Sequence, residues 1–226
     1  MFHLRRFHWK RRRAALALLP AAAMMITTGF TAAATGTVPG SDGTAAGATD
    51  SDVKIDVRRH ARAGNTIEIR GDVIPAQSRE VTVAVNGKVV GTTKSDEDGD
   101  FQLSWNAGSS GIYRVKAVVQ DTTRAAGARS DAEMVNVYRP AEASYYGPGL
   151  YGNGTACGQT LTPSTVGVAH KTLPCGTKLT LRHGGRSVKV RVIDRGPYAG
   201  NREYDLTAAT KAKLGFGSTG TVLTTR

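Results

Sequence analysis

From Val53 to Tyr138, apolar residues recur at every second position in short runs that are separated by turn residues. Val81, Val83 and Val85 form one such run, and Phe101 to Trp105 contains another. A period of two is typical of strands with one buried face, whereas a helix would show a period near 3.6. About seven such runs in roughly 85 residues predict an N-terminal β-sandwich over residues 53–139.

Two turns support this interpretation. Asn86-Gly87 lies between two β runs and predicts a tight hairpin. The acidic stretch 96–100 predicts a second reversal of the chain, as a solvated turn. Its hard carboxylate oxygens could alternatively bind calcium. The stretch lacks the EF-hand pattern, and this favours the solvated turn. With "SDEDGDFQLSW" ahead of "GIYRVKAVV", residues 53–139 resemble bacterial immunoglobulin-like domains.

The N-terminus has the order of an export signal. Of the formal charge of +12, six positive charges lie between Arg5 and Arg13, an apolar run follows over residues 14–26, and no charge recurs until Asp42. We expect a signal peptide over residues 1–34, with an uncleaved anchor as the alternative and the Sec or twin-arginine route left open. The protein is therefore expected to be exported, and secreted or associated with the cell wall.

Residues 35–52 are rich in Gly, Thr, Ser and Ala and predict a flexible linker. Because half of the net charge belongs to the signal segment, we expect no nucleic-acid partner. The remaining positive charge favours anionic wall polymers, or serves only solubility.

The only two cysteines are Cys157 and Cys175. An exported chain favours a disulfide between them, and free thiols or metal ligands are the alternatives. No Cys/His spacing indicates a metal site, and no cofactor is expected.

The composition changes after residues 139–142, which we interpret as a joint in which Pro140 ends the last sandwich strand. The block that follows, residues 143–226, predicts strands at 166–169, 178–181 and 186–194. It also predicts one short helix over residues 207–214, between an N-cap threonine and a stopping glycine.

Asp194 is the principal candidate for chemistry. It continues the parity of Val190 and Val192, so its carboxyl is expected to point inward at the end of a strand that Gly196-Pro197 terminates. A partly desolvated carboxyl suits a general acid. Alternatively, Asp194 caps the turn through backbone N–H groups.

His170 and several tyrosines accompany Asp194. His170 is a candidate partner of the carboxyl, or a structural histidine. Tyr145, Tyr146, Tyr151 and Tyr198 lie near glycines and present rings for stacking on sugars, or close the ends of a barrel.

Four segments occur in order in the C-terminal block: "ASYYGPG", "VAHKTLPCGTKL", "VRVIDRGPY" and "YDLTAATKAKLG". Together they resemble the rare lipoprotein A-like family. The resemblance implies a six-stranded double-psi β-barrel with one short helix, so that the chain is mainly β. It also implies peptidoglycan glycan strands as the ligand.

In catalytic members, the family cleaves the bond between N-acetylmuramic acid and N-acetylglucosamine without water and leaves 1,6-anhydro ends. The resemblance assigns catalysis to Asp194, with His170 as its partner. It also places Asp205 of "YDLT" in the conserved groove or its support. Together with Asp205, the residues that we predict to bind glycan are Tyr145, Tyr146, Gly147, Gln159, Arg195 and Tyr198. The sequence shows no second carboxylate beside Asp194, which a hydrolase would need.

Three departures from the family pattern matter. The predicted signal segment has no cysteine for a lipid anchor, and we expect no further glycan-binding domain after the barrel. Gln159 stands where transglycosylase members carry a glutamate, and an amide cannot transfer a proton. We therefore hold two hypotheses: a lytic transglycosylase, and a non-catalytic glycan-binding or expansin-like protein. A surface adhesin built on the sandwich would leave the barrel motifs unexplained.

Overall fold

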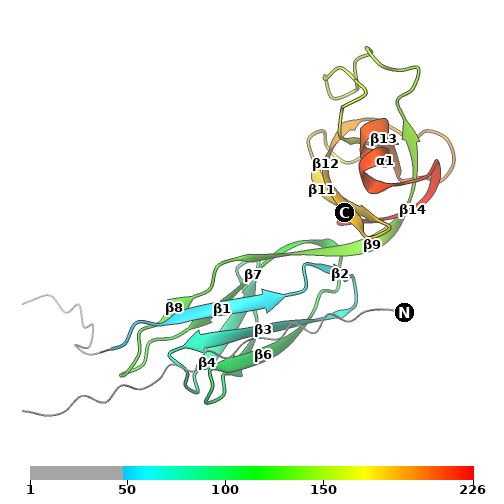
Figure 1. Ribbon diagram of the computed structural model, residues 1–226. Coiled ribbons are helices and arrows are strands. Elements are labelled where there is room, and N and C mark those ends of the chain that lie inside the picture. The colour runs from blue at the N-terminus through cyan, green and yellow to red at the C-terminus, as the bar shows by residue number, and fades with distance from the viewer. Residues whose placement is uncertain (1–47) are drawn as a thin grey trace, which may run out of the picture. The chain divides into compact units, whose positions relative to one another are not determined.

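The computed structural model describes residues 48–226 (Figure 1). The predicted signal peptide and residues 35–47 of the predicted linker lie outside the described residues. The last linker residues are described: Thr49 pairs with Ala125, and β1 begins at Asp52.

The N-terminal part is a β-sandwich, as predicted. One antiparallel sheet holds β1 (Asp52–Val57), β3 (Thr66–Ile74) and β6 (Asp100–Asn106). The other holds β4 (Glu80–Val85), β5 (Lys88–Lys94), β7 (Gly111–Val119) and the first part of β9 (Glu133–Tyr146), with short β2 (His60–Arg62) and β8 (Ala128–Arg129). Ile69 from the first sheet and Val83 and Val115 from the second are fully buried in one core.

Both predicted turns are confirmed. Asn86 and Gly87 join β4 to β5 with φ of 51° and 82°, the left-handed conformation that a two-residue hairpin requires. The Asp96 carboxylate accepts the N–H groups of Asp98 (3.0 Å) and Asp100 (2.9 Å). In residues 48–226, no group of three or more His, Cys, Asp or Glu side chains is arranged to hold a metal ion.

Strand β9 corrects the expected joint. It runs from Glu133 to Tyr146 without a break at Pro140, so proline does not end the strand. Up to Tyr138 the strand pairs with β7 and β2, and from Arg139 it pairs with β14. Proline lacks an N–H group, and it is tolerated here because the strand exchanges one set of hydrogen-bonding neighbours for another at this point.

The C-terminal part is a six-stranded mixed barrel. The second part of β9 is joined by β10 (Val168–His170), β11 (Lys178–His183), β12 (Arg186–Asp194), β13 (Tyr204–Thr207) and β14 (Thr219–Thr224). The order β9-β13-β10-β12-β11-β14 closes on itself, because β13 and β14 both pair with β9 (Figure 1). The predicted fold class is confirmed.

Helix α1 (Ala208–Leu214) packs against the barrel through buried Thr210 and Leu214. Thr207 is its N-cap and accepts the N–H of Thr210, and Gly215 ends it with φ of 62°. Both caps are as predicted. None of the helices within residues 48–226 has the length and apolar character that crossing a membrane would take.

Candidate active site

Two carboxylates flank one residue of the barrel sheet. Ala169 in β10 pairs with Asp194 in β12 on one side and with Asp205 in β13 on the other. An irregularity between Val168 and Ala169 skips Ile193, which brings Asp194 into this row. We call Asp194 and Asp205 the carboxylate pair. The expectation that no second carboxylate lies beside Asp194 is therefore wrong.

Asp194 faces a loop instead of continuing into the core. Its Oδ1 atom accepts the backbone N–H of Ala156 (2.9 Å) and of Arg195 (2.8 Å). The first bond holds the Thr155–Gln159 loop and the second caps the turn after β12, as the alternative interpretation proposed. Both bonds use the same oxygen, and within residues 48–226 the Oδ2 atom accepts no hydrogen bond of normal geometry.

Tyr146 lies close enough to both carboxylates for their charges to affect its pKa. Its hydroxyl is buried and forms no hydrogen bond of normal geometry within the described residues. Burial raises the pKa of Tyr146, and the negative charges of Asp194 and Asp205 raise it further. The phenol is therefore kept neutral, with its proton available near Asp194.

Asp205 has a different environment from Asp194. Burial raises the pKa of Asp205, and the charge of Asp194 adds to that effect. A hydrogen bond from Ser144 Oγ (2.8 Å) and the positive charge of Arg202 act in the opposite direction. A carboxylate that disfavours its charged form next to another carboxylate is a common feature of acid/base sites.

The predicted disulfide is formed and anchors the loop beside Asp194. Cys157 and Cys175 are joined, with their Cα atoms 5.6 Å apart. Cys157 also donates its N–H to the Ile193 carbonyl, at 3.3 Å. Gln159 closes the same loop, because its carbonyl accepts the N–H of Thr155 at 2.7 Å, and its side chain is exposed.

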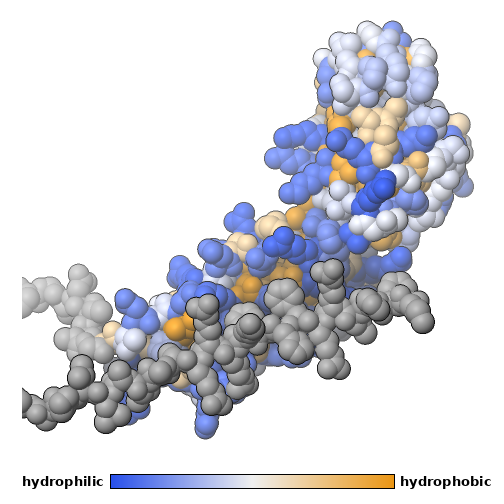
Figure 2. All heavy atoms as spheres, viewed as in Figure 1, coloured by the Kyte–Doolittle hydropathy of each residue, from blue (hydrophilic) through white to orange (hydrophobic). Residues whose placement is uncertain are grey.

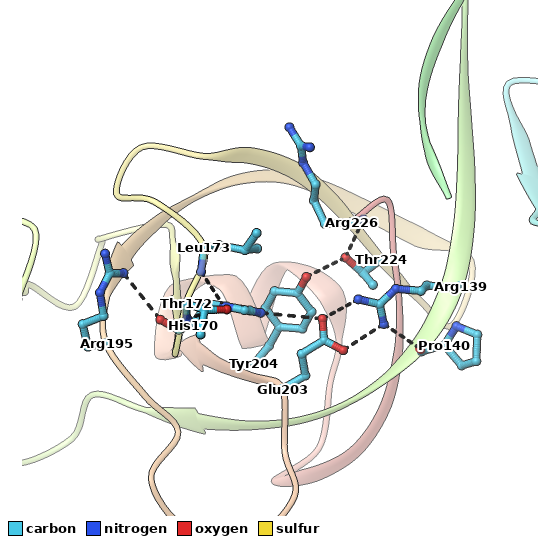
Figure 3. Close-up of polar contacts among 10 residues, drawn as sticks. All are labelled: Arg139, Pro140, His170, Thr172, Leu173, Arg195, Glu203, Tyr204, Thr224 and Arg226. Carbon is cyan, nitrogen blue, oxygen red and sulfur yellow. Dashed lines mark hydrogen bonds and ion pairs between the residues drawn. The ribbon is translucent and has the colours of Figure 1, made fainter. Parts of the chain in front are cut away.

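His170 lies in a second cluster (Figure 3). Its Nδ1 atom accepts the N–H groups of Thr172 (3.1 Å) and Leu173 (3.0 Å), and its Nε2 atom lies 3.7 Å from Glu203 Oε1. An Nδ1 acceptor requires the proton of the neutral ring to be on Nε2, which therefore faces Glu203. Among the described residues, the ring makes no hydrogen bond with Asp194.

Glu203 is in turn held by Arg139. The guanidinium donates two hydrogen bonds to the carboxylate, of 2.8 and 2.5 Å. Although burial acts to raise the pKa of Glu203, the bonds from Arg139 outweigh it and leave that pKa below its usual value. Burial lowers the pKa of His170, against the opposing effect of Glu203. We call His170, Glu203 and Arg139 the histidine cluster.

Sequence reasoning missed Glu203 and Arg139. Glu203 directly precedes the "YDLT" segment and Arg139 was assigned to the joint, so neither stood out. The sequence offered one signal for them: Glu203 and Arg139 each lie next to a strand in which apolar and polar residues alternate. Only the pairing of Arg139 with Thr224 and of Tyr204 with Ala143 brings the two together.

The remaining predicted residues differ in accessibility. Tyr198 follows Gly196-Pro197 and is 83% exposed. Tyr145 packs against the barrel core with Lys211 over its ring, at 4.1 Å from the centroid. Gly147 is buried with φ of 144°.

Arg195 donates hydrogen bonds to Cys175 Sγ (3.3 Å) and to the His170 carbonyl (3.5 Å). These bonds link the turn after Asp194 to the histidine cluster.

Comparison with known proteins gives matches to the barrel. A family model described as "Lytic transglycolase" matches residues 141–224. A "Probable endolytic peptidoglycan transglycosylase RlpA" from Synechocystis is 45% identical over 80 residues, which cover 34% of this chain and 25% of that protein. An "Endolytic peptidoglycan transglycosylase RlpA" from Neisseria meningitidis serogroup A is 43% identical over 91 residues, 39% of this chain and 38% of that protein. The match thus spans about a quarter to two fifths of these curated relatives.

Two solved structures match at low TM-scores. The Streptomyces papain inhibitor is 27% identical, covers 39% of this chain and 94% of its own, and has a TM-score of 0.31. The CARDB domain of the PF1109 protein from Pyrococcus furiosus is 18% identical, covers 38% of this chain and 91% of its own, and has a TM-score of 0.30. Nothing further is drawn from likenesses at this level.

Proposed function

Because residues 141–224 form a rare lipoprotein A-like double-psi β-barrel domain, we propose that this protein acts on peptidoglycan glycan strands as a lytic transglycosylase. The observation that carries the proposal is the placement of Asp194, which is in register with Ala169 at the end of β12 and holds the loop through the N–H group of Ala156. The disulfide and the wall-directed relatives support an extracytoplasmic location. The predicted export signal would deliver the protein there.

In the proposed reaction, the protonated Asp194 carboxyl donates its proton to O4 of N-acetylglucosamine as the bond from muramyl C1 to that oxygen breaks. The resulting carboxylate then accepts the proton of the muramyl 6-hydroxyl, whose oxygen forms the new bond to C1. One carboxyl serves as acid and then as base, and the product is a 1,6-anhydro ring. The Oδ2 atom of Asp194 is the atom we assign to both transfers.

The neighbouring groups support this role. The negative charge of Asp194 adds to burial in raising the pKa of Asp205, and the neutral Tyr146 hydroxyl can donate a hydrogen bond to the carboxylate form of Asp194. His170, predicted as the partner of Asp194, is proposed to act through the position of its own segment, because Arg195 bridges its carbonyl and the turn after Asp194. The exposed ring of Tyr198 and residues Tyr145, Gly147 and Gln159 are proposed to line the glycan path.

Gln159 favours a second candidate function. Its exposed amide lies at the end of the loop that bonds Asp194, where it can form hydrogen bonds with a sugar but cannot transfer a proton. If turnover requires a second proton-transferring group there, the barrel binds or loosens glycan strands without cutting them.

One digestion separates the two functions. Purified peptidoglycan, with and without its stem peptides, is incubated with the protein, and the soluble products are analysed by mass spectrometry. Products with 1,6-anhydromuramyl ends support the transglycosylase, and products with reducing ends would point to a hydrolase that uses both carboxylates. If no product forms but the protein co-sediments with the wall, the binding function stands and the enzyme proposal fails.

A further inference from the structure

The outward face of the β11–β12 hairpin carries three exposed cations. Lys178 precedes buried Leu179 in β11, while Lys189 and Arg191 flank buried Val190 in β12. Figure 2 shows strongly hydrophilic side chains projecting from the barrel on the side where Figure 1 places β11 and β12. We call Lys178, Lys189 and Arg191 the cationic face.

The cationic face brings like charges together without an ion pair among the described residues. Lys178 lies directly opposite Arg191 in the antiparallel register, and Lys189 lies two residues along the same strand. Like charges directly opposite each other on adjacent strands destabilise a sheet. Among residues 48–226, no carboxylate lies within 4.0 Å of any of the three cations.

The composition of the barrel accounts for this imbalance. Residues 141–226 contain eleven Lys and Arg residues and only four Asp and Glu residues. Three of those acids, Asp194, Glu203 and Asp205, belong to the carboxylate pair and the histidine cluster. The fourth, Glu142, accepts a hydrogen bond from Thr221 at 2.6 Å. No acid of the barrel is therefore left to neutralise the hairpin.

We propose that the cationic face binds the phosphodiester backbone of an anionic cell-wall polymer. Ammonium and guanidinium groups form strong, charge-assisted hydrogen bonds with phosphate oxygens. Side chains two residues apart on one strand are about 7 Å apart, so a flexible polymer with closely repeated phosphates can contact successive cations. The choice of a wall polymer rests on the proposed function, whereas the location of the face rests on the hairpin alone.

The test measures binding of purified poly(glycerol phosphate) to the whole protein by titration calorimetry. The variant K178Q/K189Q/R191Q removes the three charges, and the matched control K88Q/K94Q/K116Q removes three exposed lysines of the sandwich. We expect the first variant to bind at least about ten-fold more weakly and to show a shallower dependence on salt, because it releases fewer counterions. The control should bind within about two-fold of wild type, and K178R/K189R should retain binding.

Three results would overturn the proposal: no binding by wild type, equal weakening in the hairpin variant and its sandwich control, or tighter binding of a DNA duplex than of the polymer. The last would assign the face to nucleic acid. Digestion of polymer-free glycan strands by K178Q/K189Q/R191Q tests the proposed function separately. Its activity should equal that of wild type, since none of the three residues belongs to the candidate active site.

Discussion

The carboxylate pair and the histidine cluster lie side by side along β10 and β13, yet they satisfy their polar groups in opposite ways. In the histidine cluster, both ring nitrogens of His170 face protein groups, and both oxygens of Glu203 bind Arg139. In and beside the carboxylate pair, one oxygen of Asp194 and the buried hydroxyl of Tyr146 form no hydrogen bond of normal geometry within residues 48–226.

This difference predicts different roles for the two groups of residues. A buried polar group that is saturated by protein partners contributes to stability, because losing a partner leaves the other group unpaired. A group left unsatisfied beside an ionisable neighbour is available to a ligand. We therefore expect changes in the carboxylate pair to affect activity and changes in the histidine cluster to affect stability.

The largest expected effect is on the activity of Asp194→Asn. The amide oxygen can still accept the N–H groups of Ala156 and Arg195, but the side chain can no longer donate and recover a proton. We expect release of 1,6-anhydromuropeptides to fall by about 10²- to 10⁴-fold, with little change in thermal stability. Asp98→Asn in the sandwich is the charge-matched control. Full activity in Asp194→Asn would refute the assigned acid.

The disulfide comes next, because it anchors the loop that contacts Asp194. Replacing Cys157 and Cys175 together by serine should lower the free energy of unfolding by about 3 kcal/mol, as loop-closure entropy predicts for a separation of 18 residues. Denaturant titration of both proteins measures the difference. A doubly substituted protein of unchanged stability would show that the Ala156 and Cys157 N–H bonds alone hold the loop.

Two substitutions at His170 test how much its Nδ1 acceptor contributes to stability. His170→Ala removes the acceptor of two N–H groups and should cost about 2 kcal/mol, whereas His170→Asn can place an oxygen near the Nδ1 position and should cost about 1 kcal/mol. Both are measured by thermal unfolding. A loss of activity in His170→Asn without loss of stability would instead make His170 part of the chemistry.

The histidine cluster should also give the barrel a pH dependence. Because the pKa of His170 in the folded protein is below 6.5, the unfolded chain binds the proton more readily, and stability should decrease as the pH falls through 6.5. The contribution of Glu203, whose folded pKa is lowered, is lost only at more acidic pH, below 4.5. Unfolding midpoints between pH 8 and pH 5 measure the first effect. His170→Asn should reduce that slope, and the slope that remains includes the contribution of His60, whose pKa burial also lowers. An equal slope in the variant would contradict this assignment.

The smallest effect on stability is expected for Tyr146→Phe. The substitution removes a buried hydroxyl that forms no hydrogen bond of normal geometry within the described residues, so the free energy of unfolding should change by less than about 0.5 kcal/mol or increase slightly. Activity is the informative readout. If Tyr146 supports the carboxylate form of Asp194, product release should slow at constant stability, and unchanged kinetics would exclude the hydroxyl from the reaction.

Local features of the sequence predicted local features of the fold. The hairpin at Asn86-Gly87, the turn after Asp96 and both caps of α1 are determined by a few adjacent residues. The four ordered motifs similarly predicted the barrel, which the family match confirms. The prediction that Pro140 ends the last sandwich strand was wrong, because it assumed that the strand keeps the same hydrogen-bonding neighbours along its length.

The arrangement of the site depends on contacts between distant segments. Asp194 and Asp205 become neighbours only through Ala169, and the irregularity at Val168 cannot be read from alternation in any single strand. Glu203 and Arg139 meet across 64 positions of sequence. Such pairings follow from closure of the barrel. Asp194 and Asp205 could therefore each be predicted as a site residue from the sequence, but their proximity could not.

The unbroken course of β9 has a consequence for how the chain unfolds. One strand supplies hydrogen bonds to β7 and β2 over its first part and to β13 and β14 over its second. Detaching β9 would therefore expose unpaired edges in both the sandwich and the barrel. We expect the two cores to lose structure in a coupled transition. A barrel excised at Ala143 would lack Arg139, and with it the ion pair that holds Glu203 against His170.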